Sequence, residues 1–485
     1  MKVLISNAYF YRLDKKQWRF KEPYPPYGTL IASALLKREG YETKFWDTCL
    51  TQSPNEIEPL LQSFRPDVLV IYEDGFNYLT KMCLTRMREA AFKLAELGKK
   101  YNCKVLMSSS DATDHSEKYL DTGIDAVIAG EAEMGMLEVL ESWKEDKTLN
   151  NIKGLIFKRK STLIKTPKRP VLRNLDSLPQ ADWQEINFES YKKLWLSKHT
   201  NWALNIATTR GCPFKCNWCA KPIYGNRYNT RNPQAVVDEI EWLINSTGCR
   251  YFWMCDDIFG LKPGWVQEFN QIVQNEGLDF QYKIQSRADL LLKEDTIDVL
   301  VESGLDEVWI GAESGSQRIL DLMDKGTSIK QIEESTSLLQ QKGVTVAYFL
   351  QFGYMDESRE EIEMTIDMLK RCMPDKIGIS VSYPLPGTKF YDMVKSQMQS
   401  KFNWDDSEDF EMMYQGTFGS SFYRELYKYV HKVFQREQGI DYLKNFIGQH
   451  KKATVNRGSL LKGIALPYFA LGSKWHKSKM EKLAK

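Results

Sequence analysis

The chain has 485 residues, of which 42% are hydrophobic and 27% charged, and its formal net charge is +2. This composition is typical of a soluble globular protein, and the length corresponds to about three domains. The near-neutral charge gives no electrostatic basis for binding nucleic acid. No run approaches the apolar length of a membrane-spanning helix. The first residues, Met1–Asn7, lack the apolar core and cleavage site of a signal peptide. We therefore expect a cytoplasmic protein.

Short apolar strands alternate with helices over the first third of the chain. The expected strands are Lys2–Tyr9, Thr43–Asp47, Asp67–Tyr72, Lys104–Ser108 and Ala126–Ala129. The expected helices are Tyr27–Glu39, Asn55–Ser63, Leu84–Lys100 and Gly135–Trp143. Strands that are apolar on both faces and alternate with helices predict a doubly wound, Rossmann-like parallel sheet over residues 1–150. Such a sheet binds ligands at the carboxyl ends of its strands.

Residues 151–195 are predicted to connect this domain to the next one. A short hairpin, Leu155–Lys158 with Leu163–Thr166, precedes a stretch rich in lysine and proline. A second proline-containing turn follows at residues 175–179. Such turn signals mark a surface crossing between two domains.

Three cysteines, Cys212, Cys216 and Cys219, share one loop at the spacing C-x3-C-x2-C. Three thiolates on a tight loop can hold three irons of a [4Fe–4S] cluster, which leaves the fourth iron open to bind a small molecule. A zinc site is the weaker alternative, because zinc needs four ligands. The nearest further candidates do not stand at zinc-finger spacing: Cys249, Cys255 and His199.

Disulfide bonds are not expected, because the chain has nine cysteines, an odd number, and no secretory signal precedes them. Cysteine outside reactive sites behaves as a small hydrophobic residue. We expect the remaining six to be buried and apolar in character: Cys49, Cys83, Cys103, Cys249, Cys255 and Cys372.

The strand–helix alternation resumes between residues 196 and 400. The expected strands are Ala203–Thr208, Tyr251–Met254, Tyr282–Gln285, Glu307–Ile310, Val344–Phe352 and Lys376–Ser382, and a helix at Pro233–Asn245 follows the cysteine loop. Six such units resemble a partial (βα)6 barrel, and, as in full barrels, functional groups should collect where the strands end. Polar residues stand at those ends: Asp256, Asp257, Arg287, Glu313 and Ser314. Taken alone, an Asp pair after a strand is more often a helix cap, and a single Arg is more often part of a surface ion pair.

Residues 401–485 are predicted to form a mainly helical region. Core packing is the simpler interpretation of its aromatic stripe, and a lid over an apolar substrate cavity is the alternative: Phe410, Tyr414, Phe418, Phe422, Tyr423, Tyr427 and Tyr429. The last stretch, Ser459–Lys485, mixes apolar side chains with many lysines. An ordinary capping helix with a basic tail is the simpler interpretation, and a weak contact with a membrane surface is the alternative.

The cysteine loop, with Trp218 directly before its last cysteine, resembles the cluster loop of the radical S-adenosylmethionine (SAM) superfamily. The resemblance implies that the open iron binds SAM and that one electron cleaves SAM to methionine and a 5′-deoxyadenosyl radical. It also implies SAM contacts at the strand ends. Asp256 and Asp257 stand in the place of the family's Gly-Gly-Glu element. Arg287 would pair with the SAM carboxylate. Glu313, which Ser314 follows, would accept from the ribose or the amino group.

The N-terminal loops are similar to those of the cobalamin-binding domain that precedes the radical domain in one large class. The implied cofactor contacts are Pro26, Tyr27, Gly28, Ser108, Ser109, Ser110, Asp111, Thr113, Gly130, Glu131 and Glu133. Small residues let a flat macrocycle lie close, and hydroxyls can bond its amide side chains. The chain lacks Asp-x-His-x-x-Gly, so we expect no histidine ligand to cobalt, and Asp111 stands where the family often has histidine. A domain that has lost its cofactor is the alternative.

The resemblance runs from Met1 to about Phe434, and within the family to the branch that includes the anaerobic magnesium-protoporphyrin IX monomethyl ester cyclase. It implies a cobalamin-dependent enzyme that methylates an unactivated carbon of a small or apolar substrate. A radical oxidative cyclase or oxidoreductase is the first alternative. A non-enzymatic cobalamin or redox sensor is the second, and a sensor would not need SAM contacts. The implied partners are a low-potential flavodoxin or ferredoxin and a small-molecule or lipid-like substrate.

Overall fold

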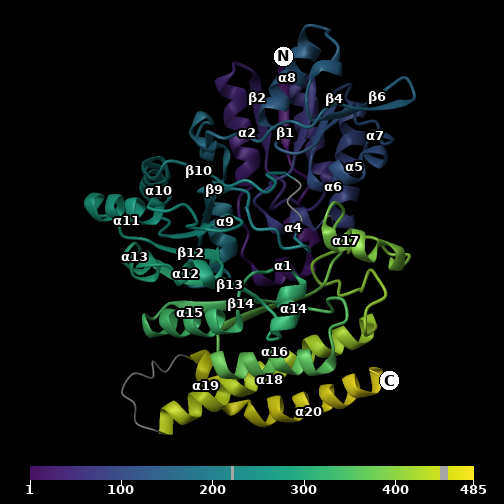
Figure 1. Ribbon diagram of the computed structural model, residues 1–485. Coiled ribbons are helices and arrows are strands. Elements are labelled where there is room, and N and C mark those ends of the chain that lie inside the picture. Colours follow the sequence, from purple (N-terminus) through teal and green to yellow (C-terminus); the bar gives the residue numbers. More distant parts are fainter. Residues whose placement is uncertain (83, 220–222, 448–456, 485) are drawn as a thin grey trace.

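The structure, a computed structural model, describes residues 1–82, 84–219, 223–447 and 457–484. It consists of an N-terminal α/β unit, a second α/β unit and a C-terminal layer of helices (Figure 1). Cys83, predicted to be buried, lies outside the described residues. Within those ranges we find no helix that is both long enough and apolar enough to cross a membrane.

Seven strands of the described chain form the first sheet, in the order β2-β1-β3-β4-β5-β6-β7. The parallel strands are β1 (Lys2–Ser6), β2 (Glu42–Trp46), β3 (Val68–Tyr72), β4 (Lys104–Ser108) and β5 (Ala126–Ile128). The last two are antiparallel: β6 (Leu155–Arg159) and β7 (Thr162–Lys165). The predicted domain boundary at residue 150 therefore cuts through this sheet. The hairpin that we assigned to the connector pairs with β5, because that edge of the sheet would otherwise be left without hydrogen-bond partners.

Alternate residues of the strands enter two separate cores, so the sheet is doubly wound as predicted. Val3 and Ile5 pack with α2 and α8, whereas Leu4 packs with α3 and α5. The long helices of this unit are α2 (Tyr27–Arg38), α3 (Glu58–Phe64), α5 (Thr85–Lys100) and α8 (Glu133–Lys144). The shorter ones are α1 (Lys15–Phe20), α4 (Tyr78–Lys81), α6 (Ser110–Asp114) and α7 (Ser116–Leu120). The core on the α2 side is continuous with that of the second unit.

The second unit is the predicted partial barrel. Its strands, all parallel, are β8 (Leu204–Ile206), β11 (Tyr251–Met254), β12 (Gln281–Ser286), β13 (Leu305–Glu313), β14 (Thr345–Phe352) and β15 (Lys376–Val381). The surrounding helices are α10 (Pro233–Thr247), α11 (Trp265–Glu276), α12 (Ala288–Leu291), α13 (Thr296–Glu302), α14 (Gln317–Leu322), α15 (Ile329–Gln341), α16 (Arg359–Cys372) and α17 (Lys389–Val394). A small ladder, β9 (Thr209–Arg210) with β10 (Asn229–Thr230), flanks the cysteine loop.

The C-terminal region is mainly helical, as predicted, and lies below α16 in Figure 1. Its helices are α18 (Ser420–Ile447), α19 (Arg457–Ile464) and α20 (Leu466–Leu483). The aromatic stripe packs in the core, where Tyr414, Phe422 and Tyr423 are buried. Residues 401–419, which we expected to begin this region, carry no helix of their own.

A buried carboxylate on α10 joins the two α/β units. Glu239 accepts hydrogen bonds from Tyr27 Oη of α2 at 3.0 Å and from Trp183 Nε1 of the connector at 2.8 Å. It also pairs with the guanidinium of Arg231 at 2.7 Å. The connector itself carries α9 (Phe188–Leu196). Because three donors from different segments meet at one carboxylate, Glu239 helps to fix how the units are oriented.

We expect Glu239→Ala to destabilise the fold by about 3–5 kcal/mol, because it leaves the Arg231 charge and two donors buried without their partner. Urea denaturation measures this loss. Glu241→Ala is the matched control on the same helix, since Glu241 is exposed, and it should change the free energy of unfolding by less than about 0.5 kcal/mol. Equal denaturation midpoints for both variants would contradict a joining role for Glu239.

Candidate functional site

The cysteine loop leaves β9 and lies over the mouth of the partial barrel. Cys212, Cys216 and Cys219 are partly exposed, whereas the other described cysteines are buried. Among the described residues, no three Cys, His, Asp or Glu side chains are grouped to hold a single metal ion. A cubane does not need such a group, because each thiolate binds a different iron. The indole Nε1 of Trp218, in the same loop, is buried without a hydrogen-bond partner. Its N–H could therefore donate a hydrogen bond to a ligand bound at this loop.

A buried arginine ties the start of this loop to the N-terminal sheet. Arg210 lies two residues before Cys212 and pairs with Glu131 and Glu133, each at 2.6 Å. All three side chains are at most 7% exposed. Burial raises the pKa of Glu131, the charge of Glu133 raises it further, and the Arg210 guanidinium opposes both. The Gly-Glu-x-Glu turn after β5 therefore holds the cysteine loop.

Contacts with the barrel hold the loop between its second and third cysteines. Asn217, directly after Cys216, donates from Nδ2 to the carbonyl of Leu322 at 2.6 Å and from its backbone N–H to that of Met323 at 3.0 Å. Its side-chain oxygen accepts from Tyr354 Oη at 2.9 Å, and its backbone carbonyl accepts from the Phe390 N–H at 2.9 Å. The loop is thus fixed before Cys212 and again between Cys216 and Cys219.

Asp256, whose role as a SAM contact stays a prediction, is bonded to the strand end that leads into the loop. It accepts from the backbone N–H groups of Thr208 and Thr209 at 2.7 and 2.8 Å, and from Thr208 Oγ1 at 2.5 Å. Burial raises the pKa of this carboxyl to about 7, although the hydrogen bonds lower it. Asp257, the second residue of the pair, is exposed at the same edge.

Arg287 follows β12 and reaches the cysteine loop. Its guanidinium lies 3.8 Å from the ring centre of Phe214 and 4.0 Å from Cys216 Sγ. It donates to Asp289 at 2.9 Å and to the carbonyl of Lys325 at 2.7 Å. Stacking on an aromatic ring fixes the orientation of a planar guanidinium. Arg287 is therefore a rigid positive group beside the Cys216 thiol.

The end of β13 presents a buried ion pair at the same mouth. Glu313 adopts a left-handed backbone conformation, with φ of 58°, and its carboxylate pairs with Lys325 at 2.7 Å. A Cβ at Gly311 would lie 2.5 Å from Lys325 Nζ, so any larger residue there would displace the ends of the paired side chains. Ser314, predicted as a contact, is fully buried, and its hydroxyl lies 3.3 Å from Thr365 Oγ1. Sequence reasoning missed Lys325, which follows a helix rather than a strand.

Most residues predicted to contact cobalamin are already bonded within the protein. Asp111 pairs with Arg88 through two bonds of 2.6 Å, and Ser109 caps α6. Thr113 donates to the carbonyl of Ser109, and the backbone N–H of Gly28 donates to Asp74. The others lie in the bonds described above or form turns at the sheet edge: Pro26 at the start of α2, Tyr27 at Glu239, Gly130 at φ of 87°, and Glu131 and Glu133 at Arg210. Their role as ligand contacts stays a prediction.

Two polar atoms at the ends of neighbouring strands have no partner. Glu73 Oε2, after β3, and Ser110 Oγ, after β4, are buried without a hydrogen bond. Burial raises the pKa of Glu73 to about 8. Ser108 ends β4 beside them and is also buried. Because unpaired buried polar atoms are costly, this edge of the sheet fits a polar ligand.

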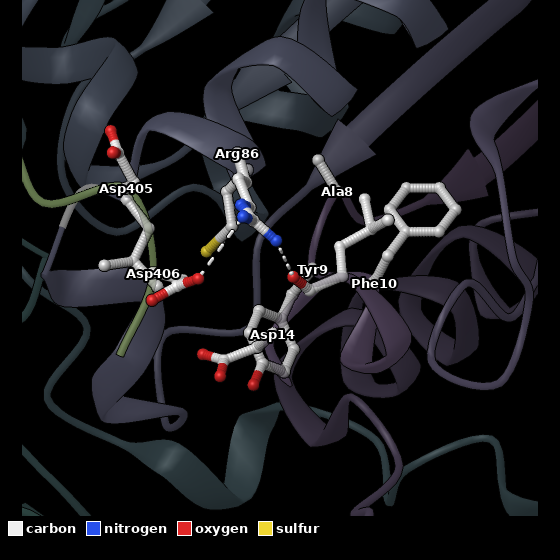
Figure 2. A pocket seen from close by; sticks show the side chains of 10 residues that line it. Ala8, Tyr9, Phe10, Asp14, Arg86, Asp405 and Asp406 are labelled. Carbon is white, nitrogen blue, oxygen red and sulfur yellow. Dashed lines mark hydrogen bonds and ion pairs between the residues drawn. The ribbon is translucent and has the colours of Figure 1, made fainter. Parts of the chain in front are cut away.

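Residues 402–414, here called the strap, cross from the barrel to the N-terminal unit. Arg86 donates to the Leu13 carbonyl at 2.7 Å and lies 3.5 Å from Asp406 (Figure 2). Asn403 accepts from Arg88 at 3.0 Å, and Arg88 in turn holds Asp111. The cavity left beneath, next to Ala8, is about 10 Å³, which is room for about one water molecule. The strap therefore packs against α5 and the segment that follows β1.

A larger cavity, of about 180 Å³, lies between the two units. Tyr27 and Phe76 line it from the first unit, Leu178 from the connector, and Arg210 and Arg231 from the second. Both guanidiniums are ion-paired. The interface between the two units thus contains a cavity that is partly lined by charged side chains and lies next to Arg210, at the start of the cysteine loop.

The fold and the cysteine loop define a radical SAM domain joined to a Rossmann-like domain, and residues 206–369 match the radical SAM superfamily. This part of the chain is similar to the radical SAM enzymes of that superfamily.

Relatives extend the likeness beyond that domain. An uncharacterized methyltransferase of Pyrococcus horikoshii is 25% identical over 78% of this chain and 81% of its own length. The anaerobic magnesium-protoporphyrin IX monomethyl ester cyclase of Cereibacter sphaeroides is 26% identical over 79% of this chain and 63% of its own. The solved structure of OxsB, a cobalamin-dependent SAM radical enzyme with aqua-cobalamin bound, matches 99% of this chain and 80% of its own at 15% identity, with a TM-score of 0.70. The resemblance inferred from the sequence is confirmed, and the fold is similar to that of the cobalamin-dependent OxsB structure.

The raised pKa of Asp256 predicts a pH dependence. Between about pH 4 and 7 the folded state holds a proton that the unfolded state has lost, so stability falls as the pH rises through this window. Asp256→Asn removes that proton. From pH 5 to pH 7 the wild type should lose roughly 2–3 kcal/mol more stability than the variant, as measured by urea unfolding. Asp257→Asn, the exposed neighbour, should follow the wild type, and identical slopes for all three proteins would contradict the assignment.

Arg210→Gln should free the cysteine loop. It leaves two carboxylates buried side by side, which costs about 3–5 kcal/mol, and the reconstituted protein should lose iron to a chelator several times faster. Arg318→Gln is the control, because it removes a comparable pair with Glu361 from a half-exposed position. Iron loss at the wild-type rate in Arg210→Gln would mean that the barrel contacts of Asn217 alone fix the loop.

Proposed function

We propose that this chain methylates a carbon atom of its substrate by cobalamin-dependent radical SAM chemistry. The observation that carries the proposal is the double attachment of the cysteine loop, through Arg210 to the strand end of the N-terminal sheet and through Asn217 to the barrel. This arrangement brings a cluster loop and the ligand-binding edge of a Rossmann-like sheet together. Methyl transfer from cobalamin near a SAM-cleaving cluster requires that proximity.

The residues at the barrel mouth fit the group that the family implies. Cys212, Cys216 and Cys219 would hold the [4Fe–4S] cluster. Arg287 and Lys325 provide positive charge for a carboxylate, and Glu313 provides an acceptor for an amine or hydroxyl. When bound, the cluster, SAM and cobalamin supply the electron, the radical and the methyl group. The protein side chains hold and orient these groups. We assign Asp256 no role in proton transfer, although its pKa is raised.

At the N-terminal sheet, Glu73 and Ser110 are the side chains that we propose for cobalamin, with Ser108 beside them. Asp111 is held by Arg88 and Tyr119, so we propose that it shapes the loop and leaves cobalt without a side-chain ligand from this position.

A substrate with an apolar face is favoured by the inner side of the barrel. Val308 and Ile310 of β13 face the outer core, so Trp309 between them faces inward. Its ring stacks on that of Phe349 at 4.6 Å, and both are partly exposed. A Cβ at Gly378 would lie 3.1 Å from Trp309, so glycine leaves space at this ledge. A small-molecule or lipid-like substrate fits such a wall.

Cyclisation or oxidation of the cyclase type is the second candidate, because the Cereibacter sphaeroides relative is a cyclase. The name of the Pyrococcus horikoshii relative favours methyl transfer. A sensor without catalysis is disfavoured, because Arg287, a group suited to binding the SAM carboxylate, lies 4.0 Å from the thiol of Cys216. We further propose a flavodoxin or ferredoxin as electron donor and the reducing cytoplasm as location, since an open cluster is sensitive to oxidation.

Anaerobic reconstitution with iron, sulfide and cobalamin, followed by dithionite and SAM, tests the proposal. We expect 5′-deoxyadenosine in the wild type and its loss in Cys216→Ala, because that change removes one of three cluster ligands. Cys372→Ala is the control, since Cys372 is buried far along the chain from the loop. S-adenosylhomocysteine beside 5′-deoxyadenosine would indicate methyl transfer, and 5′-deoxyadenosine alone would favour the cyclase. Intact SAM with bound cobalamin would overturn the enzyme assignment in favour of the sensor.

A further inference from the structure

The outermost helices of the C-terminal layer expose a row of large apolar side chains. The row recurs every third or fourth residue on α19 and α20, with exposed fractions from 57 to 70%: Leu461, Ile464, Tyr468, Leu471 and Trp475. That spacing places them on one face. The opposite face is buried against α18 through Phe469, His476 and Met480. We call this exposed row the outer face.

The outer face is rigidly held. His476 Nδ1 lies 2.8 Å from Glu425 of α18, and Lys479 donates to the same carboxylate at 2.9 Å. A Cβ at Gly439 would lie 2.8 Å from the carbonyl of Lys462, so the backbones of α18 and α19 approach closely. Figure 1 shows α20 at the edge of the molecule, and ion pairs of Glu481 with Arg359 and of Lys477 with Glu363 attach it to α16. The apolar row is therefore preformed and does not cover any part of the described chain.

Basic side chains surround the row. Residues 457–484 contain six Lys and Arg but one acidic residue, Glu481. Lys432 Nζ lies 4.1 Å from the ring centre of Tyr468, and Lys479 Nζ lies 5.3 Å from that of Trp475. Lys474 and Lys482 are exposed beside them. Apolar and aromatic side chains flanked by lysines match the interface of an anionic lipid bilayer, where rings lie at the headgroups and lysines meet phosphates.

We propose that the outer face docks the enzyme on an anionic membrane surface. A second copy of the chain is the other occupant to consider, because the spacing also suits a helix pair. In a two-fold interface, however, each surface meets itself, so the basic residues of one copy would face those of the other. An anionic surface instead attracts these lysines, at about 1 kcal/mol each. The inference is independent of the reaction at the cluster loop.

Vesicle co-sedimentation of the full chain tests the proposal. The probes are vesicles of phosphatidylcholine alone and of phosphatidylcholine with phosphatidylglycerol. We expect at least about tenfold more binding to the anionic vesicles, and loss of that binding in Leu471→Glu/Trp475→Glu. Leu338→Glu is the matched control, since Leu338 is an exposed leucine on α15, and it should bind as the wild type does. Circular dichroism shows whether each variant folds.

A second pair, Lys474→Gln/Lys482→Gln, keeps the apolar row and removes two charges. It should weaken binding to the anionic vesicles about tenfold or more and make it less dependent on salt. Absence of wild-type binding to either vesicle would overturn the proposal. So would a dimer, seen by analytical ultracentrifugation, that Leu471→Glu/Trp475→Glu dissociates, because the outer face would then be an interface between copies.

Discussion

The buried ion cluster of Arg210, Glu131 and Glu133 is the interaction on which the arrangement of this protein depends. It links Arg210, two residues before Cys212, to the turn that follows β5 of the first sheet. Burying three charges is costly, and well-packed apolar residues would often be more stable. What the cluster provides is a defined position, because two carboxylates and one planar guanidinium fit in few ways. The cysteine loop is consequently fixed relative to both sheets.

Several other buried contacts follow from this placement. Glu239 gathers donors from the first unit, the connector and the barrel, and Asp256 fixes the strand end that precedes the loop. The strap then attaches residues beyond the barrel to helix α5 of the N-terminal unit through Arg86 and Arg88. These contacts join the two α/β units to each other. The carboxyl ends of parallel strands, where ligands bind in both fold types, are thereby brought toward one loop.

Particular residues show how far the sequence could be interpreted. The parallel strands of both sheets were predicted close to their observed bounds, because a strand covered on both faces is a continuous apolar run. The hairpin Leu155–Arg159 with Thr162–Lys165 was assigned to the connector, because its polar outer residues do not reveal which edge it joins. Asp256 and Glu131 were assigned to cofactors from their place after strands. Their observed partners, Thr208 and Arg210, lie 48 and 79 residues away along the chain.

The sequence by itself determined the class of fold, the cysteine loop and the set of polar strand ends, because periodicity and short spacing are local properties of a chain. Only the tertiary structure decided which of those polar groups are bonded within the protein and which are left for a ligand. It also decided that Lys325 joins Glu313 at the barrel mouth, and that one face of α20 is covered while the other is exposed. A charge is paired by whatever the fold brings near it, and the distances involved are set by packing between segments remote in sequence.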